Sequence, residues 1–341
     1  MEFLSSLFSS GTLSQLLVGL SRTTILFIVS SGLSLILGVL RIPNIAHGSL
    51  YMIGAFLAYS VIHLFGGGVP AFAAALVIAP LGVAALGFVL ERGFFSYLYE
   101  REHLMLLLLT FSFALIIGDL VKIVWGTEYR SVTLPAALQG SAEILGLPLP
   151  YYNLVLLLVG PVIAVFLWLV INRTKMGKIA RAAAVDREMV SAVGINVGWV
   201  FAFTFVLGCF LAGLGGALIA PMTNISLGMD HSLIIEAFLI VIMGGLGNVW
   251  GALLGSLVFG ITQSLGILVW PKFGIVFPYL AVVAVLVFRP LVRPGIAGIG
   301  EDSLLPAVQQ GRRLVDVGFV GGGAGDRVHH PRGDIDPDMR S

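Results

Sequence analysis

The chain has 341 residues, of which 58% are hydrophobic and 11% are charged, and its formal net charge is +1. Soluble domains contain roughly 25% charged residues, and a chain this apolar could not cover its surface in water, so a soluble protein is excluded. The apolar residues form continuous runs of the roughly 20 residues that a helix needs to cross a bilayer, without the alternation of a membrane β-barrel. The sequence therefore predicts an all-α polytopic membrane protein.

Nine apolar segments follow one another along the chain and are expected to be helices. In chain order they cover approximately residues 13–40, 45–65, 70–90, 104–125, 151–171, 199–220, 233–243, 249–270 and 274–288. The seventh segment is too short to span a bilayer unaided and is either re-entrant or continuous with its neighbour, so we expect eight or nine crossings. Residues 13–299 are thus predicted to form one transmembrane domain.

A polar break separates the first two apolar segments, in the string R-I-P-N-I-A-H-G of residues 41–48. Pro43 and Gly48 flank this break, and Asn44 and His47 lie within it. Freed backbone at membrane depth is tolerated only where protein or a water-filled cavity surrounds it. Asn44 and His47 therefore either line a translocation pathway or make structural hydrogen bonds. No other ligand residue stands nearby at the spacing of a metal site.

Other charged residues also fall inside apolar segments, where each costs several kcal/mol unless it is partnered or faces water, so each is a functional candidate, and Asp119 and Glu236 are candidate pathway residues. Asp119 lies three residues before Lys122, and the two side chains could pair. Glu236 lies near the start of the seventh segment, where interfacial solvation explains it about as well as pathway lining does. Arg22 lies well inside the first segment, unless it marks the point where that helix starts.

The segment of residues 173–196 separates two apolar segments and carries five basic and two acidic side chains. Residues 178–193 contain no Pro or Gly and many alanines, which predicts a single helix that ends at Gly194. Ile179, Ala183, Val190 and Val193 would form its apolar side, and Arg181, Asp186, Arg187 and Glu188 would face solvent. This helix is either a solvated linker or a docking surface for a partner protein.

Basic residues also predict the orientation of the chain. With nine crossings, a cytoplasmic position for residues 173–196 places most other basic residues on the same side of the membrane. These include Arg41, Arg92, Arg101, Arg289 and Arg293, whereas Lys122, Arg130 and Lys272 fall on the opposite side. We therefore expect residues 1–12 to form an external N-terminus.

Small residues four positions apart form two stripes, which predict close helix packing. One stripe consists of Gly208, Ala212, Gly216 and Ala220, and the other of Gly247, Gly251 and Gly255. Close backbone approach supplies much of the packing between helices in lipid. Each stripe therefore lies either between helices of this chain or at an interface with another subunit.

The chain presents no recognisable nucleotide-binding motif. The glycine-rich string that begins at Gly244 lacks the Lys-Ser/Thr of a phosphate-binding loop and lies between apolar segments. If ATP drives this protein, another chain binds it. After about residue 300 the apolar periodicity disappears and charges return, so residues 300–341 are predicted to be a disordered tail.

Four strings, in the same order along the chain, resemble one family of membrane proteins. They are N-I-A-H-G from Asn44, R-A-A-A-V-D-R-E-M-V-S-A-V-G-I-N from Arg181, A-F-L-I-V-I-M-G-G-L-G-N-V-W-G-A-L-L-G from Ala237 and R-P-L-V-R-P-G-I-A-G from Arg289. Together they resemble the Liv-type H subunit of the branched-chain amino acid ABC transporter permeases, over roughly residues 12–300.

The resemblance implies an ABC importer permease bundle in the bacterial inner membrane. It also implies a second homologous permease, two cytoplasmic ATPase subunits and a periplasmic or extracellular solute-binding protein as partners. This chain would then be no enzyme and would bind no cofactor, because ATP and Mg²⁺ belong to the ATPase subunits. Nucleic acid has no part in such an assembly. Relatives import branched-chain amino acids, other amino acids, urea or short amides.

Within this resemblance, the residues from Gly177 to Gly194 would be a coupling helix that seats in an ATPase subunit. The matching positions are Arg181, Asp186, Glu188 and Gly194, whereas Arg187 stands where a proline is usual. Ile45 replaces the usual aromatic residue, and Gln263 replaces a common glutamate. These departures leave the solute open.

The chief alternative is a self-sufficient secondary transporter or channel, for which the break at residues 43–48 would form a midplane site. Against this alternative, the membrane segments lack a chain of carboxylates. A membrane-embedded enzyme would need a nucleophile and base or a metal cluster at depth, and the sequence presents none.

Overall fold

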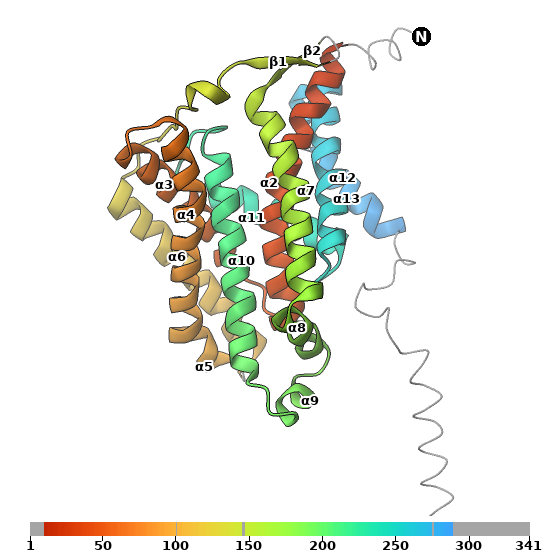
Figure 1. Ribbon diagram of the computed structural model, residues 1–341. Coiled ribbons are helices and arrows are strands. Elements are labelled where there is room, and N and C mark those ends of the chain that lie inside the picture. Colours follow the sequence, from red (N-terminus) through yellow and green to blue (C-terminus); the bar gives the residue numbers. More distant parts are fainter. Residues whose placement is uncertain (1–9, 100, 145–146, 275, 289–341) are drawn as a thin grey trace, which may run out of the picture. The chain divides into compact units, whose positions relative to one another are not determined.

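The computed structural model describes residues 10–99, 101–144, 147–274 and 276–288 (Figure 1). Most of the expected external N-terminus and all of the tail predicted after residue 300 lie outside these residues. The elements described below belong to one unit of the chain, which ends at Ile296.

Nine long helices occupy the described residues, and each coincides with one predicted apolar segment. They are α2 (Ser10–Leu40), α3 (Ala46–Leu64), α4 (Gly68–Leu90), α6 (His103–Trp125), α7 (Tyr151–Arg173), α10 (Val197–Ile219), α11 (Met229–Gly244), α12 (Val249–Val269) and α13 (Val276–Phe288). The agreement has a physical cause. An apolar run in a membrane must satisfy its backbone hydrogen bonds internally, and a helix does so.

Six of the described helices are long and apolar enough to cross a membrane. These candidate spans are Gln15–Leu40, Gly68–Leu98, Leu104–Trp125, Tyr151–Arg173, Val197–Ile219 and Val249–Val269. Helices α3, α11 and α13 fall outside this set. The chain is therefore a polytopic helical membrane protein, whereas the eight or nine crossings and the external N-terminus stay predictions.

Shorter elements connect the long helices. A π-helical turn, η1 (Glu91–Phe95), and α5 (Ser96–Leu98) continue α4, and the short helices η2 (Ala136–Leu138) and η3 (Pro271–Phe273) lie in connections. Strand β1 (Ser141–Ile144) pairs antiparallel with β2 (Leu147–Pro150), with Ser141 opposite Pro150. Helices α8 (Lys175–Val185) and α9 (Arg187–Ala192) connect α7 to α10. The strands and the α8–α9 loop lie at opposite ends of the bundle, here called the strand end and the loop end (Figure 1).

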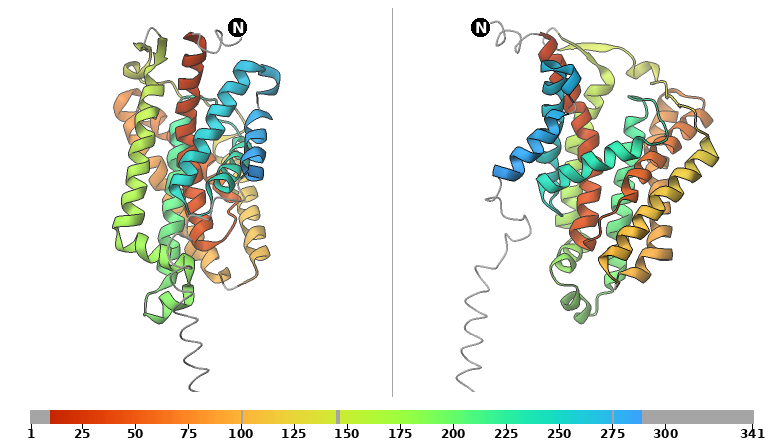
Figure 2. Two further views of the ribbon diagram at one scale, coloured as in Figure 1. Left: turned by 90° about the vertical axis from the view of Figure 1, so that its right-hand side faces the viewer. Right: turned by 180° about the vertical axis from the view of Figure 1, so that it is seen from behind.

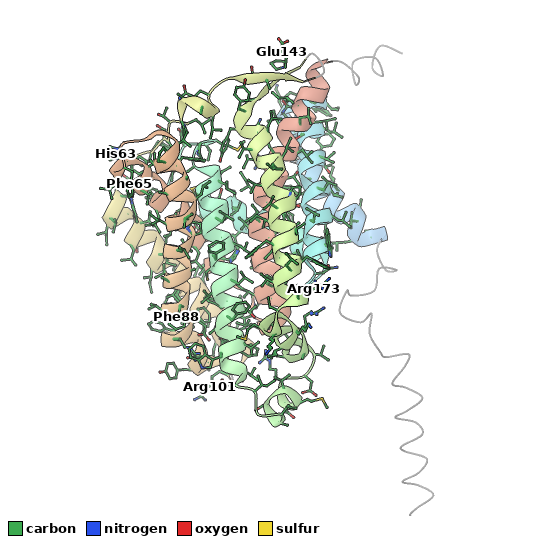
Figure 3. The ribbon with its side chains drawn as sticks, in the orientation of Figure 1. His63, Phe65, Phe88, Arg101, Glu143 and Arg173 are labelled. Atoms are coloured by element: carbon green, nitrogen blue, oxygen red, sulfur yellow. The ribbon has the colours of Figure 1, made fainter. Side chains whose placement is uncertain are left out.

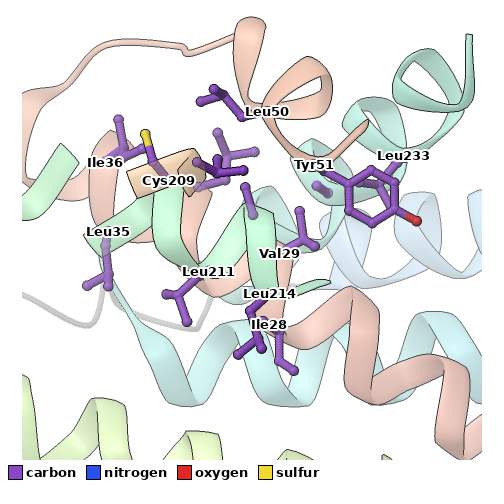
Figure 4. Packing of buried hydrophobic residues seen from close by; sticks show 14 of the residues in the cluster. Ile28, Val29, Leu35, Ile36, Leu50, Tyr51, Cys209, Leu211, Leu214 and Leu233 are labelled. Atoms are coloured by element: carbon purple, nitrogen blue, oxygen red, sulfur yellow. The ribbon is translucent and has the colours of Figure 1, made fainter. Parts of the chain in front are cut away.

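Helix α2 is the central helix of the bundle, and Figure 2 shows it running the length of the structure. It packs against α7, α10, α11 and α12, while α10 also packs against α3 and α4. Buried residues of α2, α3, α10 and α11 form one hydrophobic core, part of which is drawn in Figure 4. Within the span Gln15–Leu40, Arg22 is the one exposed residue.

Small residues bring α10 into backbone contact with its neighbours. A Cβ atom at Gly32 of α2 would lie 2.9 Å from the carbonyl oxygen of Gly208, and one at Gly208 would lie 3.0 Å from the carbonyl oxygen of Gly32. Gly216 packs against the backbone of Tyr51 in α3, and Ala212 is fully buried. Members of this predicted stripe therefore pack between helices of this chain.

The second predicted stripe is divided between a turn and a helix. Gly247 lies before the start of α12 with a φ of +72°, a conformation that glycine adopts without steric cost. Its N–H donates to the carbonyl oxygen of Ser34 in α2 at 3.1 Å. Gly251 and Gly255 lie on α12 and pack closely against the backbone of α11. Gly247 is thus not on the same helix face as the other two, although all three pack within this chain.

Helices α3 and α11 begin inside the bundle rather than at one of its ends. His47, in the first turn of α3, has its Nε2 atom 3.1 Å from the carbonyl oxygen of Val29. Val29 precedes the end of α2 by eleven residues, or about 16 Å at ~1.5 Å per residue, so the first turn of α3 lies beside α2 well before its end. The first turn of α11 lies beside the same part of α3, because Ser49 donates a hydrogen bond to Asp230.

Candidate functional site: the α8–α9 loop and the α2–α3–α11 junction

The α8–α9 loop lies at the end of the bundle where Figure 3 also labels Arg101 and Arg173. Thr174 caps the start of α8, and its Oγ1 accepts a hydrogen bond from the Gly177 N–H at 3.0 Å. Gly177 has no room for a side chain, because a Cβ atom there would overlap the backbone at the end of α7. This glycine therefore allows α8 to fold tightly against α7.

A break at Asp186 divides the loop into two helices. Asp186 has an extended backbone, with φ −143° and ψ 107°, and its Oδ1 accepts a hydrogen bond from the Met189 N–H at 3.0 Å. Aspartate is a preferred N-cap residue, and Glu188 adds favourable negative charge to the first turn of α9. The single helix predicted over residues 178–193 is wrong, because an N-cap residue can start a new helix without any Pro or Gly.

The outer face of the loop combines charged and apolar side chains. The exposed charged residues of the loop are Lys175, Lys178, Arg181, Asp186 and Glu188, and its exposed large apolar residues are Val185, Met189 and Val193. Val193 was expected on the buried side but is 75% exposed, because it follows the last turn of α9. Ala183 and Val190 are buried, as predicted. Apolar side chains exposed among charges are typical of an interaction surface.

Two arginines connect the inner side of the loop to the end of α2 through hydrogen bonds. Arg187 Nη2 donates to the carbonyl oxygen of Leu40 at 2.8 Å, and Arg41 Nη2 donates to that of Ala184 at 2.9 Å. The Arg187 guanidinium also lies 4.8 Å from the ring centroid of Phe201 in α10. Burial, and next the charge of Arg41, lower the pKa of Arg187. The prediction that Arg187 faces solvent is wrong, because the last carbonyls of a helix need donors and Arg187 supplies one.

An acidic and aromatic network extends from Phe201 to the π-helical turn. Tyr99 packs edge-on against Phe201 at 5.1 Å, and its hydroxyl donates to Glu91 Oε1 at 2.9 Å. Glu91 is fully buried, with its Oε2 3.5 Å from Arg92 Nε, and the Arg92 guanidinium lies 4.0 Å from the ring centroid of Trp199. Burial, and next the charge of Glu91, raise the pKa of Tyr99. Sequence reasoning missed this network, although the Glu91-Arg92 pair in an apolar run was a signal.

Asn44 and His47, the first predicted pathway candidates, are completely buried. His47 contacts the backbone of α2, whereas the side-chain amide of Asn44 has no hydrogen-bond partner among the described residues. Thr110 Oγ1 donates to the carbonyl oxygen of Pro43 at 3.2 Å, so α6 also contacts the break. The structure thus places this pair in the protein interior, and a role in lining a pathway stays a prediction.

The first turns of α3 and α11 meet at Asp230. Its Oδ2 accepts a hydrogen bond from Ser49 Oγ at 2.8 Å, and both side chains are buried. Gly48 permits this approach, because a Cβ atom there would lie 2.7 Å from the Asp230 carbonyl oxygen. Helix N-termini favour negative charge, so the beginnings of two helices stabilise the Asp230 carboxylate. Sequence reasoning missed this residue, whose partner is 181 positions away.

Arg22 and Glu236 form an ion pair between α2 and α11, with 3.3 Å between Nη2 and Oε1. Arg22 therefore lies within α2 and does not mark its start. The Arg22 side chain is 47% exposed and that of Glu236 is 12% exposed. Asp119 and Lys122 are both exposed on α6, and no ion pair joins them in the described part of the chain. Their expected pairing is thus absent, and a pathway role for Asp119 stays a prediction.

Comparison with known proteins establishes the family to which this chain belongs. A sequence profile described as "Branched-chain amino acid transport system / permease component" matches residues 15–287. The chain belongs to this permease family. The resemblance to this family is thereby confirmed.

Individual permeases are similar over most of their length. The high-affinity branched-chain amino acid transport system permease protein BraD of Pseudomonas aeruginosa is 28% identical over 305 residues, which cover 85% of this chain and 96% of BraD. LivH of Escherichia coli is 27% identical over 270 residues, covering 74% and 85% respectively. A probable LivH permease of Methanocaldococcus jannaschii is 28% identical over 303 residues, covering 83% and 91%. With its apolar helices, this permease is a multi-pass integral protein of the bacterial inner membrane.

Proposed function

We propose that this permease is the transmembrane subunit of an ATP-driven ABC importer for branched-chain or other hydrophobic amino acids. Two separate cytoplasmic subunits hydrolyse ATP, and a second homologous permease and an external solute-binding protein complete the assembly. The observation that carries the proposal is the α8–α9 loop. Its outer face exposes charged and apolar side chains, and its inner side is tied to the central helix α2.

The loop can transmit movement because of these attachments. Arg41 and Arg187 join it to the last turn of α2, which in turn packs against four other helices. An ATPase subunit shifts the balance between two conformations of the bundle only if it binds one of them more tightly. A tenfold shift requires about 1.4 kcal/mol of differential binding. A few contacts that the loop makes in one nucleotide state and loses in the other supply energy on this scale.

Replacing both Arg181 and Glu188 by alanine tests the docking surface. Both side chains are exposed on the outer face of the loop. In the complete transporter, we expect the double variant to reduce stimulation of ATPase activity by loaded binding protein by about tenfold, which corresponds to ~1.4 kcal/mol of lost contact energy. Lys122→Gln on α6 is the control, since it removes an exposed charge far from the loop in sequence. Unchanged stimulation and uptake in the double variant would contradict the docking role.

A self-sufficient secondary transporter is the second candidate, because α3 and α11 both begin inside the bundle, as discontinuous helices of such transporters do. That protein would move solute alone in response to an ion gradient. Proteoliposomes that contain this permease without ATPase subunits distinguish the two functions. Gradient-driven uptake there would favour the secondary transporter, and its absence, with ATP-driven uptake by the full assembly, supports the importer.

A further inference from the structure

The ion pair between α2 and α11 lies deep within the span of the bundle. Thr24 of α2 packs against Gly160, which lies nine residues from the start of α7 at the strand end. Thr23 packs against Gly260, which lies nine residues from the end of α12. At ~1.5 Å per residue, both contacts place the neighbouring Arg22 about 14 Å from the ends of these helices. The hydrocarbon core is ~30 Å thick, so Arg22 lies near its middle.

Arg22 has hydrogen-bond donors that this chain does not use. A guanidinium carries five N–H donors, and among the described residues the one hydrogen bond that Arg22 makes goes to Glu236. Its side chain is half-exposed, whereas every other described residue of the span Gln15–Leu40 is partly or fully buried. Charged donors facing hydrocarbon are strongly unfavourable. The exposed side of this pair therefore faces water, a polar ligand or the second permease rather than lipid.

Asp230, six residues earlier on α11, does not share these properties. Its carboxylate is bound by Ser49 and buried at the meeting of two helix N-termini. Glu236 has Arg22 as its one hydrogen-bond partner in the described residues, and part of its side chain remains accessible. Of the two acidic groups on this helix, Glu236 is thus the one able to exchange its partner.

We propose that Arg22 and Glu236 bind the charged groups of an amino acid as it crosses the membrane. A guanidinium binds a carboxylate through paired hydrogen bonds, and the Glu236 carboxylate accepts hydrogen bonds from an ammonium. A zwitterion can therefore exchange partners with the ion pair, and no charge is left unpaired at membrane depth. This inference rests on the proposed import function and specifies its solute class: zwitterionic amino acids rather than urea or short amides.

Competition binding to the purified complete transporter, without binding protein, tests the assignment. The probe is radiolabelled leucine. Its competitors are leucinamide, which lacks the carboxylate, and 4-methylpentanoate, which lacks the ammonium. We expect Arg22→Gln to weaken leucine binding at least tenfold and to abolish the preference for leucine over leucinamide. We expect Glu236→Gln to abolish the preference for leucine over 4-methylpentanoate. Arg22→Lys should retain the preference for leucine over leucinamide at reduced affinity, because it keeps the charge and loses the paired hydrogen bonds, and Lys122→Gln should match the wild type.

Three outcomes would overturn the inference. They are an absence of leucine binding to the wild type, wild-type preferences in both glutamine variants, and an equal loss of affinity for all three compounds. The last outcome would mean that the ion pair acts as a structural clamp between α2 and α11. Failure of the import function is recognised separately, because the wild-type assembly would then show no ATP-dependent uptake of leucine whatever the variants bind.

Discussion

Gly216 and Gly118 show how differently a single glycine acts in two helices of this permease. A Cβ atom at Gly216 would overlap the backbone of Tyr51 in α3, whereas one at Gly118 of α6 would meet no atom within 4 Å. In lipid, where the hydrophobic effect gives little drive for association, close backbone approach is a main source of helix packing. Gly216 is therefore required by the fold, and Gly118 is not.

Gly216→Ala should lower stability, because backbone cannot move aside as a flexible side chain can. Overpacking of a core costs about 1–3 kcal/mol, and we expect a loss of this size or larger in the thermal unfolding of the purified permease in detergent. Gly118→Ala is the matched control and should leave the unfolding temperature unchanged or slightly raised, because alanine has the higher helix propensity. Equal effects of the two substitutions would contradict this account of the packing.

The α8–α9 loop is organised by one capping residue. Asp186 ends α8 with an extended backbone and starts α9 by accepting the hydrogen bond from Met189. This change of direction precedes Arg187, whose guanidinium reaches the end of α2. The break therefore allows one short segment to present an outer face to a partner while its inner face holds the bundle.

Asp186→Ala should remove the break, because alanine favours the helix interior and cannot cap. Loss of an N-cap costs about 0.5–2 kcal/mol, and we expect faster hydrogen exchange in α9 together with weaker stimulation of the ATPase. Asp186→Asn should keep the wild-type hydrogen exchange in α9, since asparagine caps a helix about as well as aspartate. If the alanine variant retained normal exchange and stimulation, the break would have no role in coupling.

The sequence predicts the long helices of this permease well because hydropathy alone specifies them. The nine apolar segments correspond to helices of the described chain, since each run must form internal hydrogen bonds in lipid. The break at Asp186 was not predicted, because a helix cap does not change the spacing of apolar residues. The Arg22–Glu236 pair was not predicted either, because its members are 214 positions apart, and local pattern carries no information about which helices meet.

At the scale of the whole molecule, the two arginine contacts connect the loop end to the core. Arg187→Gln should uncouple the transporter, because the outer face of the loop is unchanged while its attachment to Leu40 and Phe201 is lost. We expect ATPase stimulation to persist and the ratio of leucine imported to ATP hydrolysed to fall severalfold. Lys175→Gln, in the same loop and exposed, should leave that ratio at the wild-type value. A normal ratio in the Arg187 variant would show that coupling takes another route.

The glycine crossing of α2 and α10 has a mechanical consequence. At Gly32 and Gly208 the two helices approach closely, and each glycine lies against the carbonyl oxygen of the other. Such a contact can serve as a fulcrum, because a small change of tilt preserves it. Leu40 lies eight residues beyond Gly32, which makes the end of α2 the tip of a lever about 12 Å long. The loop is fastened at this tip, where we expect a given rotation of α2 to produce its largest displacement.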